Sequence, residues 1–508
     1  MTIPEFRDQI SGKIAAVLGV GVSNVPLIKF LLKCGATVHG FDARDKSEIA
    51  DHDELVNLGA QFHLGENYLE ILMNHITYTP LAKGGMSHSD RGDFFTRPDV
   101  IFKTPGIRPD IPELLAAAER NIEITSEMEL FLKLCPAPII GVTGSDGKTT
   151  TTTLIYEMLK TEYERSPKTA RKPYIGGNIG TPLIAEIENI TANDIIAFEM
   201  SSFQLYTMQQ SPNIGIITNM TPNHLDWHTD MTEYINAKKN ICGINSDRTK
   251  TVILNADNDI TREIAADVRG KKNVIMFSKE LLTAGVCIEN GTIVRRENSA
   301  TTEQFFNVSD IRLPGIHNVE NFLTAVTATL GIVSSESTLH VAQTFGGVPH
   351  RIEFVREFDG VRYYNDSIAT TPARARAGLN SFSNVGAISN RPQSLATAGK
   401  NHLIVIAGGY DKNIPFNEFG EILNARAKAV VLLGATAEAI EEAIKSAPNY
   451  TGELTVTRAT TLEEATVKAK ALTAPNDIVI LSPACASFDM FKNFEVRGNK
   501  FKEIVNNL

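Results

Sequence analysis

Cysteine is scarce and scattered in this sequence. There are five cysteines in 508 residues, and no two of them are separated by only two positions. Disulfide scaffolds and cysteine-ligated zinc sites rely on closely spaced pairs, so we expect neither. Five unpaired thiols are typical of a protein that is kept reduced in the cytoplasm.

Positive charge and long apolar runs are also missing. Lys and Arg number 49 against 59 Asp and Glu, so the net charge is −10. This balance argues against a nucleic-acid partner held by phosphate neutralisation. No apolar run is long enough for a membrane span, and the first residues lack the basic-then-apolar form of a signal peptide. We therefore expect a soluble cytoplasmic protein with neither a nucleic-acid nor a membrane partner.

What is present is an alternation of short β-branched runs and longer amphipathic segments. This pattern predicts the α/β class with parallel sheets. At about 150 residues per domain the length suggests three domains. Domain boundaries are predicted at the linker-like residues 135–138 and at the Gly-Gly-Val-Pro stretch 346–349. The predicted domains are therefore 1–136, 137–346 and 347–508. Residues 80–97 and 383–401 are polar and unpatterned, and we expect loops there.

Individual elements can be predicted along the chain. In the first domain we expect strands at 13–20, 37–41 and 100–103, with a helix at 25–34 that ends at Gly35. A strand at 139–142 opens the second domain. The third domain is predicted to contain strands 403–407, 429–433 and 478–481 and helices 416–425 and 438–446.

A glycine-rich loop follows the strand at 139–142 and opens a helical segment. Glycines allow backbone N–H groups to face phosphate oxygens, and a helix N-terminus adds partial positive charge. Lys148 can reach the β- and γ-phosphates, and Thr149 can ligate Mg²⁺. The strict phosphate-loop spacing fails because position 142 is Val, and the alternative is a chance glycine-rich turn. We predict ATP binding by Gly144, Ser145, Asp146, Gly147, Lys148, Thr149 and Thr150.

A weaker signal lies near the start of the chain. The turn 19–24 resembles a dinucleotide fingerprint without its third glycine, and Asp42 stands where a ribose-binding acid is expected. A structural turn without a ligand is an equally good interpretation. A nicotinamide cofactor is the other alternative, although nothing else in the sequence indicates a redox enzyme.

Four further stretches carry a family resemblance. They are residues 198–205, 218–226 with 237–238, 313–318 with 321, and 481–498. Together with the glycine-rich loop they resemble the Mur ligases, the ATP-dependent amide-forming enzymes of peptidoglycan precursor synthesis. The last stretch, with residues 365–367 and 408–412, is most similar to the members that add D-glutamate.

The resemblance implies a fold and a reaction. It implies a Rossmann-like N-terminal domain for a UDP-linked substrate, a central P-loop ATPase-type domain with a mainly parallel sheet, and a Rossmann-like C-terminal domain for the amino acid. The implied reaction joins D-glutamate to UDP-N-acetylmuramoyl-L-alanine through an acyl phosphate and releases ADP and phosphate. The alternatives are another muramyl amino-acid ligase, a folylpolyglutamate synthetase-like ligase, or a nucleotide-hydrolysing switch protein.

The resemblance also implies roles for residues that are unremarkable when read alone. Glu199 would otherwise be a solvated strand end, His224 an exposed loop histidine, Asn178 a turn residue and Lys238 a surface lysine. The implied catalytic residues are Lys148, His224, Lys238 and Asn178. The implied ligands of two Mg²⁺ ions are Thr149, Glu199, His224 and Lys238. Lys238 would be carbamylated by CO₂, and its neighbour Lys239 leaves the register open by one residue.

The remaining implied contacts concern the three substrates. The further ATP contacts are His317, Asn318, Asn321, Arg351 and Asp366. The UDP-substrate contacts are Gly21, Val22, Ser23, Asn24, Asp42, Arg44, Thr104, Pro105, Gly106, Asn178, Ser201 and Gln204. The D-glutamate contacts are Thr370, Lys412, Ser487, Phe488 and Phe494. We expect a monomer that uses only these small-molecule partners.

The acceptor side of the C-terminal domain has two aromatic residues and lacks one lysine. Composition alone places Phe488 and Phe494 in the core, with any ligand contact made by their backbone amides. Many family members carry a lysine where this chain has Ile368. Either Lys412 or another cation supplies that charge, or the chain belongs to a subgroup without it.

Overall fold

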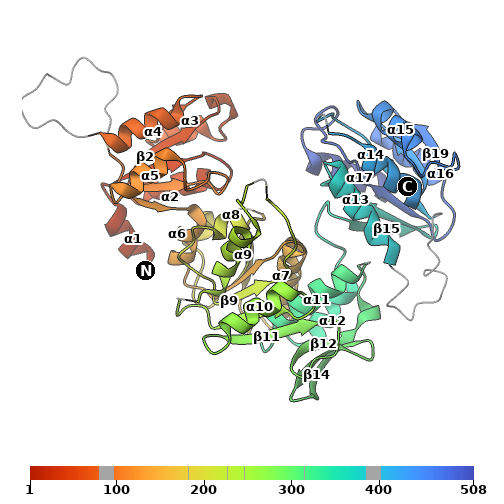
Figure 1. Ribbon diagram of the computed structural model, residues 1–508, viewed down its shortest axis with the longest axis horizontal. Coiled ribbons are helices and arrows are strands. Elements are labelled where there is room, and N and C mark those ends of the chain that lie inside the picture. Colours follow the sequence, from red (N-terminus) through yellow and green to blue (C-terminus); the bar gives the residue numbers. More distant parts are fainter. Residues whose placement is uncertain are drawn as a thin grey trace, which may run out of the picture. The chain divides into compact units, whose positions relative to one another are not determined.

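The computed structural model describes residues 1–78, 97–180, 182–225, 227–244, 246–313, 315–384, 402–412 and 414–508. Helices and strands alternate along the chain and build three sheets (Figure 1), which confirms the predicted α/β class. Of the two predicted loops, residues 80–96 and 385–401 lie outside the described residues. The chain divides into two compact units: residues 1–278 with 284–286 and 324–333, and residues 279–283, 287–323 and 334–508. The three-domain boundaries stay a prediction.

The first sheet is parallel and has the order β3-β2-β1-β4-β5. Its strands are β1 (Ile14–Leu18), β2 (Thr37–Asp42), β3 (Gln61–Leu64), β4 (Val100–Lys103) and β5 (Glu123–Thr125). Its helices are α1 (Ile3–Ile10), α2 (Asn24–Lys33), α3 (His52–Asn57), α4 (Tyr68–Thr77), α5 (Pro112–Glu119) and α6 (Glu127–Leu134). The strand order reverses between β1 and β4. Ligands of such sheets bind where the order reverses, beyond the carboxyl ends of the strands.

The first unit also contains a parallel run of strands with the order β11-β10-β9-β6-β8-β7. These strands are β6 (Ile139–Thr143), β7 (Pro173–Gly177), β8 (Ile195–Glu199), β9 (Ile214–Ile217), β10 (Thr251–Asn255) and β11 (Asn273–Ser278). The accompanying helices are α7 (Lys148–Arg165), α8 (Ser202–Leu205), α9 (Met231–Lys239) and α10 (Asp259–Val268). The carboxyl ends of β6, β7, β8 and β9 therefore meet at one edge.

The second unit contains the antiparallel pair β13 (Thr292–Glu297) and β14 (Ala300–Asn307), which follow β12 (Gly285–Glu289). Two helices, α11 (Ile316–Ala328) and α12 (Ser335–Thr344), precede the C-terminal sheet. That sheet has the order β15-β16-β20-β17-β18-β19, and only β15 is antiparallel to its neighbour.

The C-terminal strands are β15 (Glu353–Phe358), β16 (Val361–Asn365), β17 (Leu403–Ala407), β18 (Ala427–Leu432), β19 (Thr455–Arg458) and β20 (Ile478–Leu481). The helices are α13 (Pro372–Asn380), α14 (Asn417–Arg426), α15 (Ala437–Ser446), α16 (Leu462–Ala471) and α17 (Phe494–Asn506). All of β17 is buried, and Val405 packs in one apolar cluster while Ile404 and Ile406 pack in another. Apolar side chains on both faces require helices on both faces, as parallel sheets do.

Two predictions for the whole chain concern disulfides and membrane-spanning segments. All five cysteines are unpaired and buried, in agreement with the absence of a disulfide framework. Among the described residues, no helix combines the length and the hydropathy that a membrane span requires.

Candidate functional site

The glycine-rich loop between β6 and α7 has a backbone that only glycine can adopt. Gly144 and Gly147 have φ values of +147° and +79°, and a side chain at Gly144 would collide with Thr218 Oγ1. The Thr218 hydroxyl donates to the Asp146 carbonyl over 2.6 Å, and the Asp146 amide donates to Asn219 Oδ1 over 2.9 Å. The segment after β9 therefore holds the loop in place at the N-terminus of α7, where phosphate groups bind.

Lys148 bends back over this loop. Its Nζ donates to the carbonyl oxygens of Gly144 and Ser145 over 3.0 and 2.9 Å. Both partners are neutral, and phosphate oxygens make stronger, charge-assisted hydrogen bonds with an ammonium group. Lys148 Nζ thus lies where a triphosphate bound by the loop would contact it.

Lys238 reaches the same loop from α9, and its side chain is buried. Only 1% of the residue is exposed, and Nζ donates to the Gly144 carbonyl over 2.7 Å and to Thr143 Oγ1 over 3.3 Å. Burial, followed by the charge of Lys148, lowers the pKa of Lys238 well below its ordinary value. The interpretation as a surface lysine is wrong. Lys239 instead forms an ion pair with Asp267 at 2.6 Å.

Glu199 is the last residue of β8 and is 2% exposed. Its Oε1 accepts a hydrogen bond of 3.0 Å from Asn178 Nδ2, and the Asn178 amide donates to the Glu199 carbonyl over 2.9 Å. The other carboxylate oxygen, Oε2, is buried and has no hydrogen-bond partner in the described part of the chain. The interpretation as a solvated strand end is therefore wrong. A buried carboxylate oxygen without a donor suits a hard cation such as Mg²⁺.

His224 lies in the loop between β9 and α9 with a φ of +56°. Its ring is half-buried and meets the Phe203 ring at a centroid distance of 4.9 Å. Ser145 Oγ donates to the Thr221 carbonyl over 2.9 Å, which ties this loop to the glycine-rich loop. The Tyr234 ring lies 6.4 Å from the His224 ring and 4.8 Å from Lys238 Nζ, so both residues border the same aromatic side chain.

Ser201 and Gln204, predicted substrate contacts, cap the short helix α8. Ser201 Oγ accepts from the Gln204 amide over 3.3 Å, and Gln204 Oε1 accepts from the Ser201 amide over 2.8 Å. Both side chains therefore have a structural role. The residues around the loop that the sequence analysis did not single out are Thr143, Thr218 and Tyr234. No motif marks Tyr234, because it is the fourth residue of the ordinary helix α9 and belongs to no glycine or histidine pattern.

The N-terminal turn is held together by the two residues predicted to face uracil. Asp42 Oδ2 accepts from the Val20 amide over 2.7 Å and from Arg44 Nη2 over 2.8 Å. Burial would raise the pKa of Asp42, but the hydrogen bonds from Arg44 and Val20 outweigh burial and lower it. Asn24 Nδ2 donates to the Gly19 carbonyl over 2.7 Å. Val22, in contrast, is 78% exposed at the tip of the turn.

The predicted Thr104–Gly106 segment lies beside this turn. A Cβ at Gly19 would be 2.6 Å from Thr104 Cγ2, so the carboxyl ends of β1 and β4 are in close contact. Lys103, which the sequence analysis missed, is 3% exposed and donates to the Ile107 carbonyl over 3.1 Å. Burial lowers the pKa of Lys103 to about 8. The available signal was a lysine that ends an otherwise apolar strand.

In the second unit, the predicted adenine-side residues lie at the start of α11. Asn318 and Asn321 share a helix face, as expected, and Asn321 Nδ2 donates to Asn318 Oδ1 over 3.2 Å. His317 is exposed and lines a pocket of about 200 Å³ together with residues of α13. The pocket residues are Gly315, Ile316, His317, Ala377, Asn380 and Ser381.

A buried arginine holds the segment that precedes Ser487 and Phe488. Arg497 is 2% exposed and donates to the carbonyls of Ser367, Cys485 and Ala486 over 2.9, 3.0 and 3.0 Å. Ser367 Oγ also accepts from Arg497 Nε and donates to the Phe494 carbonyl. This arginine thus joins the ends of β16 and β20 to the start of α17.

The other acceptor-side residues differ in exposure. Ser487 is 2% exposed, Phe494 and Thr370 are half-buried, and Lys412 is exposed. The core assignment of Phe488 is wrong: it is 65% exposed and meets Tyr410 at a ring distance of 5.9 Å. Because Arg497 fills the inner side of the turn, Phe488 projects outward.

Asp366 is buried beside these residues. Ser482 Oγ donates to Asp366 Oδ2 over 3.1 Å, and the Ile352 amide donates to Oδ1 over 3.3 Å. Burial raises the pKa of Asp366 to about 7, against the opposing effect of these hydrogen bonds. Arg351 contributes a smaller charge effect that lowers the pKa.

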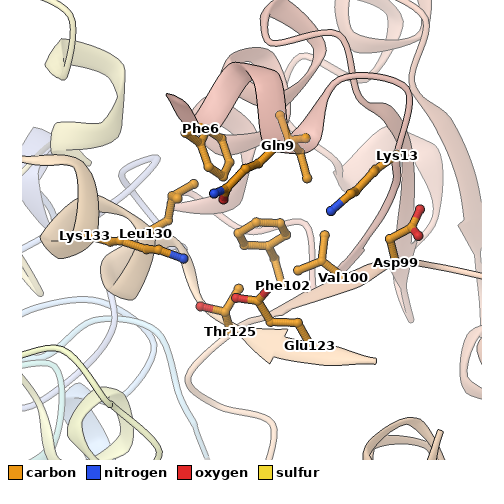
Figure 2. Close-up of a pocket in the computed structure, with 11 residues that line it drawn as sticks. Phe6, Gln9, Lys13, Asp99, Val100, Phe102, Glu123, Thr125, Leu130 and Lys133 are labelled. Carbon is orange, nitrogen blue, oxygen red and sulfur yellow. The ribbon is translucent and has the colours of Figure 1, made fainter. Parts of the chain in front are cut away.

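A separate pocket of about 60 Å³ lies at the opposite edge of the first sheet. Figure 2 shows Phe102 at its centre, with Lys13 and Asp99 on one side and Lys133 on the other. Lys13 and Asp99 precede β1 and β4, so the pocket is at the amino ends of these strands. It is therefore not part of the site predicted at the carboxyl ends.

Comparison with known proteins places the site in a family context. The Mur ligase middle domain matches residues 142–329, and the Mur ligase glutamate ligase domain matches residues 350–485. A UDP-N-acetylmuramoylalanine--D-glutamate ligase of Acetivibrio thermocellus is 44% identical over 99% of this chain and 98% of its own. A protein of the same name from Ruminiclostridium cellulolyticum is 42% identical over 100% and 99%.

A solved structure supports the fold at lower identity. The UDP-N-acetylmuramate-alanine ligase MurC of Thermotoga maritima matches 97% of this chain and 99% of its own, with a TM-score of 0.54 and 19% identity. The full-length similarity to the two D-glutamate ligases is well above the level that shows common descent. The chain belongs to the Mur ligase family.

Proposed function

We propose that this protein is an ATP-dependent ligase that joins D-glutamate to UDP-N-acetylmuramoyl-L-alanine in peptidoglycan precursor synthesis. The observation that carries the proposal is the 44% identity to a D-glutamate ligase over 99% of this chain and 98% of the relative. The geometry of the glycine-rich loop, with two lysines and a buried glutamate at the same sheet edge, supports an ATP-dependent reaction.

The reaction requires activation of the substrate carboxylate, which is a poor electrophile. A carboxylate oxygen of the substrate attacks the γ-phosphorus, the bond to the β-phosphate oxygen breaks, and ADP leaves. The product is an acyl phosphate. The neutral amine of D-glutamate then attacks the acyl carbon, inorganic phosphate departs, and the nitrogen loses a proton. Positioning and charge neutralisation are the main tasks of the protein in such transfers.

The residues near the glycine-rich loop suit these tasks. We propose that Lys148 contacts the transferred phosphoryl group and that the loop amides bind the triphosphate. Glu199, whose Oε2 has no donor in the described structure, together with Thr149 and His224 would hold two Mg²⁺ ions. Bound Mg²⁺ supplies positive charge that offsets the negative charge of the phosphates. Asn178, held against Glu199 over 3.0 Å, would keep that carboxylate in position.

Lys238 is proposed to carry a carbamate. Its neutral amine can add to the carbon of CO₂ with release of a proton, and the product is an anion. Burial and the nearby Lys148 lower the pKa of Lys238, which favours the neutral, nucleophilic amine. The carbamate would reverse the charge at this position and supply a ligand for the second Mg²⁺ ion.

The remaining substrate groups are the UDP-linked sugar, the base and ribose of ATP, and D-glutamate. The UDP group would face residues 21–24, Asp42 and Arg44, with Thr104, Pro105 and Gly106 toward the sugar. The ATP base and ribose would face His317, Asn318, Asn321 and Asp366, with Arg351 toward the phosphates. D-Glutamate would face Thr370, Lys412 and Ser487 and the backbone amides of Phe488 and Phe494. Lys412, which is exposed, is the proposed cation in place of the lysine absent at Ile368.

A panel of amino-acid acceptors tests the proposal. Purified protein is given ATP, Mg²⁺ and UDP-N-acetylmuramoyl-L-alanine, and phosphate release is measured with D-glutamate, L-glutamate, L-lysine or diaminopimelate. We expect release with D-glutamate and little with the others. Equal turnover with L-lysine or diaminopimelate would favour another muramyl ligase. Phosphate release that needs no amino acid would favour a nucleotide-hydrolysing switch protein.

We further propose that the protein acts as a cytoplasmic monomer. ATP and a nucleotide-linked sugar are both soluble cytoplasmic metabolites, and each proposed contact residue is supplied by a single chain. Size-exclusion chromatography with light scattering gives the mass directly, and a dimer mass would contradict this part of the proposal.

A further inference from the structure

Three histidines gather on one face of the first sheet. His39 lies in β2, His63 in the adjacent strand β3, and His75 in α4. The register pairs Phe41 with His63, so His39, Phe41 and His63 project from the same face. The helix α4 packs against β2 and β3 and contributes His75.

The cluster is enclosed. His39 and His75 are 4% and 3% exposed, and His63 is half-buried. The Phe41 ring packs at 4.7 Å against His63 and at 5.7 Å against His75, which forms an apolar wall. Each imidazole carries two ring nitrogens, and either can act as a metal ligand.

The nitrogen atoms are close enough to share one ion. One ring nitrogen from each histidine lies within 4.8 Å of the others, and His39 Nδ1 is 3.1 Å from His63 Nε2. At a zinc–nitrogen distance of 2.0–2.1 Å, tetrahedral ligands are roughly 3.3 Å apart. The observed separation is therefore compatible with common coordination after a small adjustment of His75.

The charge state of the cluster also suits metal binding. Burial, and then the neighbouring His75 and His63, lowers the pKa of His39 to about 4. The His39 ring is thus neutral near pH 7, and neutral imidazole is the form that ligates metals. Imidazole nitrogens suit zinc-like ions, whereas Mg²⁺ requires oxygen ligands.

We infer that His39, His63 and His75 form a binding site for a divalent zinc-type metal ion, with water in the remaining position. The ion would join β2, the neighbouring strand β3 and α4. It would also fix the end of β2, where Asp42 holds the Val20 amide at 2.7 Å. This site is independent of the proposed ligase reaction and of the oxygen-rich region at Glu199.

Zinc titration of the full-length protein tests the inference. The purified protein is stripped with a chelator, returned to excess MgCl₂, and titrated with Zn²⁺ against a chromogenic competitor while the thermal midpoint is recorded. His63→Gln removes the most exposed ligand of the cluster. His52→Gln is the matched control, since His52 lies in the same region and instead pairs with Asp53 at 3.0 Å.

We expect the wild type and His52→Gln to bind one more equivalent of Zn²⁺ than His63→Gln does. Zinc should raise the thermal midpoint of the first two proteins and leave that of His63→Gln unchanged. Equal zinc stoichiometry and equal midpoint shifts in all three proteins would overturn the inference and leave a metal-free stack of neutral imidazoles.

A spectroscopic measurement on the wild type keeps the test decisive if His63→Gln does not fold. Co²⁺ added to the stripped wild-type protein in excess MgCl₂ should give the intense visible bands of a tetrahedral cobalt centre, and Zn²⁺ should abolish them. Absence of these bands would overturn the inference without recourse to any variant.

Discussion

Lys238 and Glu199 have ionisable side chains but are almost fully buried, with 1% and 2% of each residue exposed. Burial of an ionised group is costly unless the group is paired or changes its protonation state. The Lys238 amine donates to the neutral oxygens of Thr143 and Gly144, and Glu199 Oε2 has no donor among the described residues. Such an arrangement is unfavourable for folding alone, and it is expected where a ligand or modification completes the site.

The first prediction at this scale compares two adjacent lysines. Lys238→Ala should lower turnover by about 10²-fold or more, the scale of losing one preorganised electrostatic group. Lys239→Ala should stay within roughly twofold of the wild type, since surface ion pairs such as that with Asp267 contribute little. The measurement is D-glutamate-dependent phosphate release. Equal losses in both variants would show that the helix as a whole, not Lys238, is needed.

The carbamate can be observed directly. With ¹³C-labelled bicarbonate, the wild type and Lys239→Ala should each show one carbamate carbon signal, and Lys238→Ala should show none. A wild-type spectrum without this signal would rule out the modification while leaving the requirement for Lys238 intact.

Lys148 provides the second prediction. Lys148→Ala removes the ammonium group that lies on the glycine-rich loop, so turnover should fall by about 10²-fold or more. Lys160→Ala is a suitable control, because Lys160 lies on the same helix and forms only an exposed ion pair with Glu157 at 3.8 Å. Circular dichroism should be unchanged in both variants. Near wild-type turnover of Lys148→Ala would mean that the loop does not bind the reacting phosphate.

Asp366 gives a pH prediction. Its pKa in the folded protein is about 7, above the ordinary value of 3.8, because burial disfavours the carboxylate. The Asp366 carboxyl group binds its proton more tightly in the folded protein, so below its unfolded-state pKa it adds to the free energy of unfolding. This contribution is lost as the pH rises from about 4 to about 7. We expect Asp366→Asn to lose less stability than the wild type between pH 5 and pH 8 in urea unfolding. Parallel pH profiles would indicate that Asp366 ionises normally.

The sequence did not predict the surroundings of the proposed site residues, and the roles of those residues stay predictions. The motifs singled out Lys238, but its burial depends on Thr143 and Tyr234, which pack around it from β6 and α9. Exposure of Phe488 also could not be predicted, since it follows from Arg497 occupying the inside of the turn. Contacts between segments distant in the sequence decide burial, and local composition does not report them.

At the scale of elements, buried strands were predicted closely. Strands 403–407 and 478–481 match β17 and β20, because each is a continuous apolar run that follows a polar residue. The pair β13 and β14 was not predicted. Its turn uses Asn298 and Ser299, with φ values of +50° and +65°, and this dipeptide is a weaker hairpin signal than Asn-Gly or Asp-Gly.

The helix α9 is anchored at the end opposite Lys238. Glu233, in its first turn, accepts from His228 Nδ1 over 3.0 Å and from Arg108 Nη1 over 3.2 Å. Burial opposes ionisation of Glu233, but the hydrogen bonds from Arg108, His228 and Thr229 outweigh it and lower its pKa to about 2. Arg108 also donates to the Trp227 carbonyl over 2.6 Å, and Trp227 Nε1 donates to the Gly106 carbonyl over 3.2 Å. The predicted sugar-facing segment is thereby joined to the helix that carries Lys238.

This connection predicts a substrate-specific defect. Arg108→Gln removes a charged hydrogen bond worth about 1.5–3 kcal/mol, so the KM for the nucleotide-linked sugar should rise by about tenfold or more. The KM for ATP should change much less. Arg120→Gln is the control, since Arg120 donates to the Ala116 carbonyl within its own segment. Equal increases in both KM values would show that Arg108 acts on folding rather than on this segment.

At the scale of the whole molecule, the three sheets each have their own strand order and their own predicted substrate. The motifs predict what each region binds because they lie at carboxyl ends of strands, as in Gly19–Asn24 after β1 and the loop after β6. The division into regions is harder to predict, and the two compact units do not coincide with the three predicted domains. Composition marks linkers, but the density of contacts across a linker depends on side chains elsewhere in the chain.

We expect the chain to close during the reaction, because the three predicted binding regions belong to different predicted domains. ATP and D-glutamate must approach within bonding distance of one substrate carboxylate, and we expect movement at hinges near residues 136 and 347. Small-angle scattering should therefore show a smaller radius of gyration with a non-hydrolysable ATP analogue, UDP-N-acetylmuramoyl-L-alanine and D-glutamate than without ligands. Lys148→Ala should compact less at the same ligand concentrations, because it lacks the contact between loop and phosphate. An unchanged radius of gyration in the wild type with all ligands bound would contradict closure, because the chain would then bind all its substrates without a change of shape.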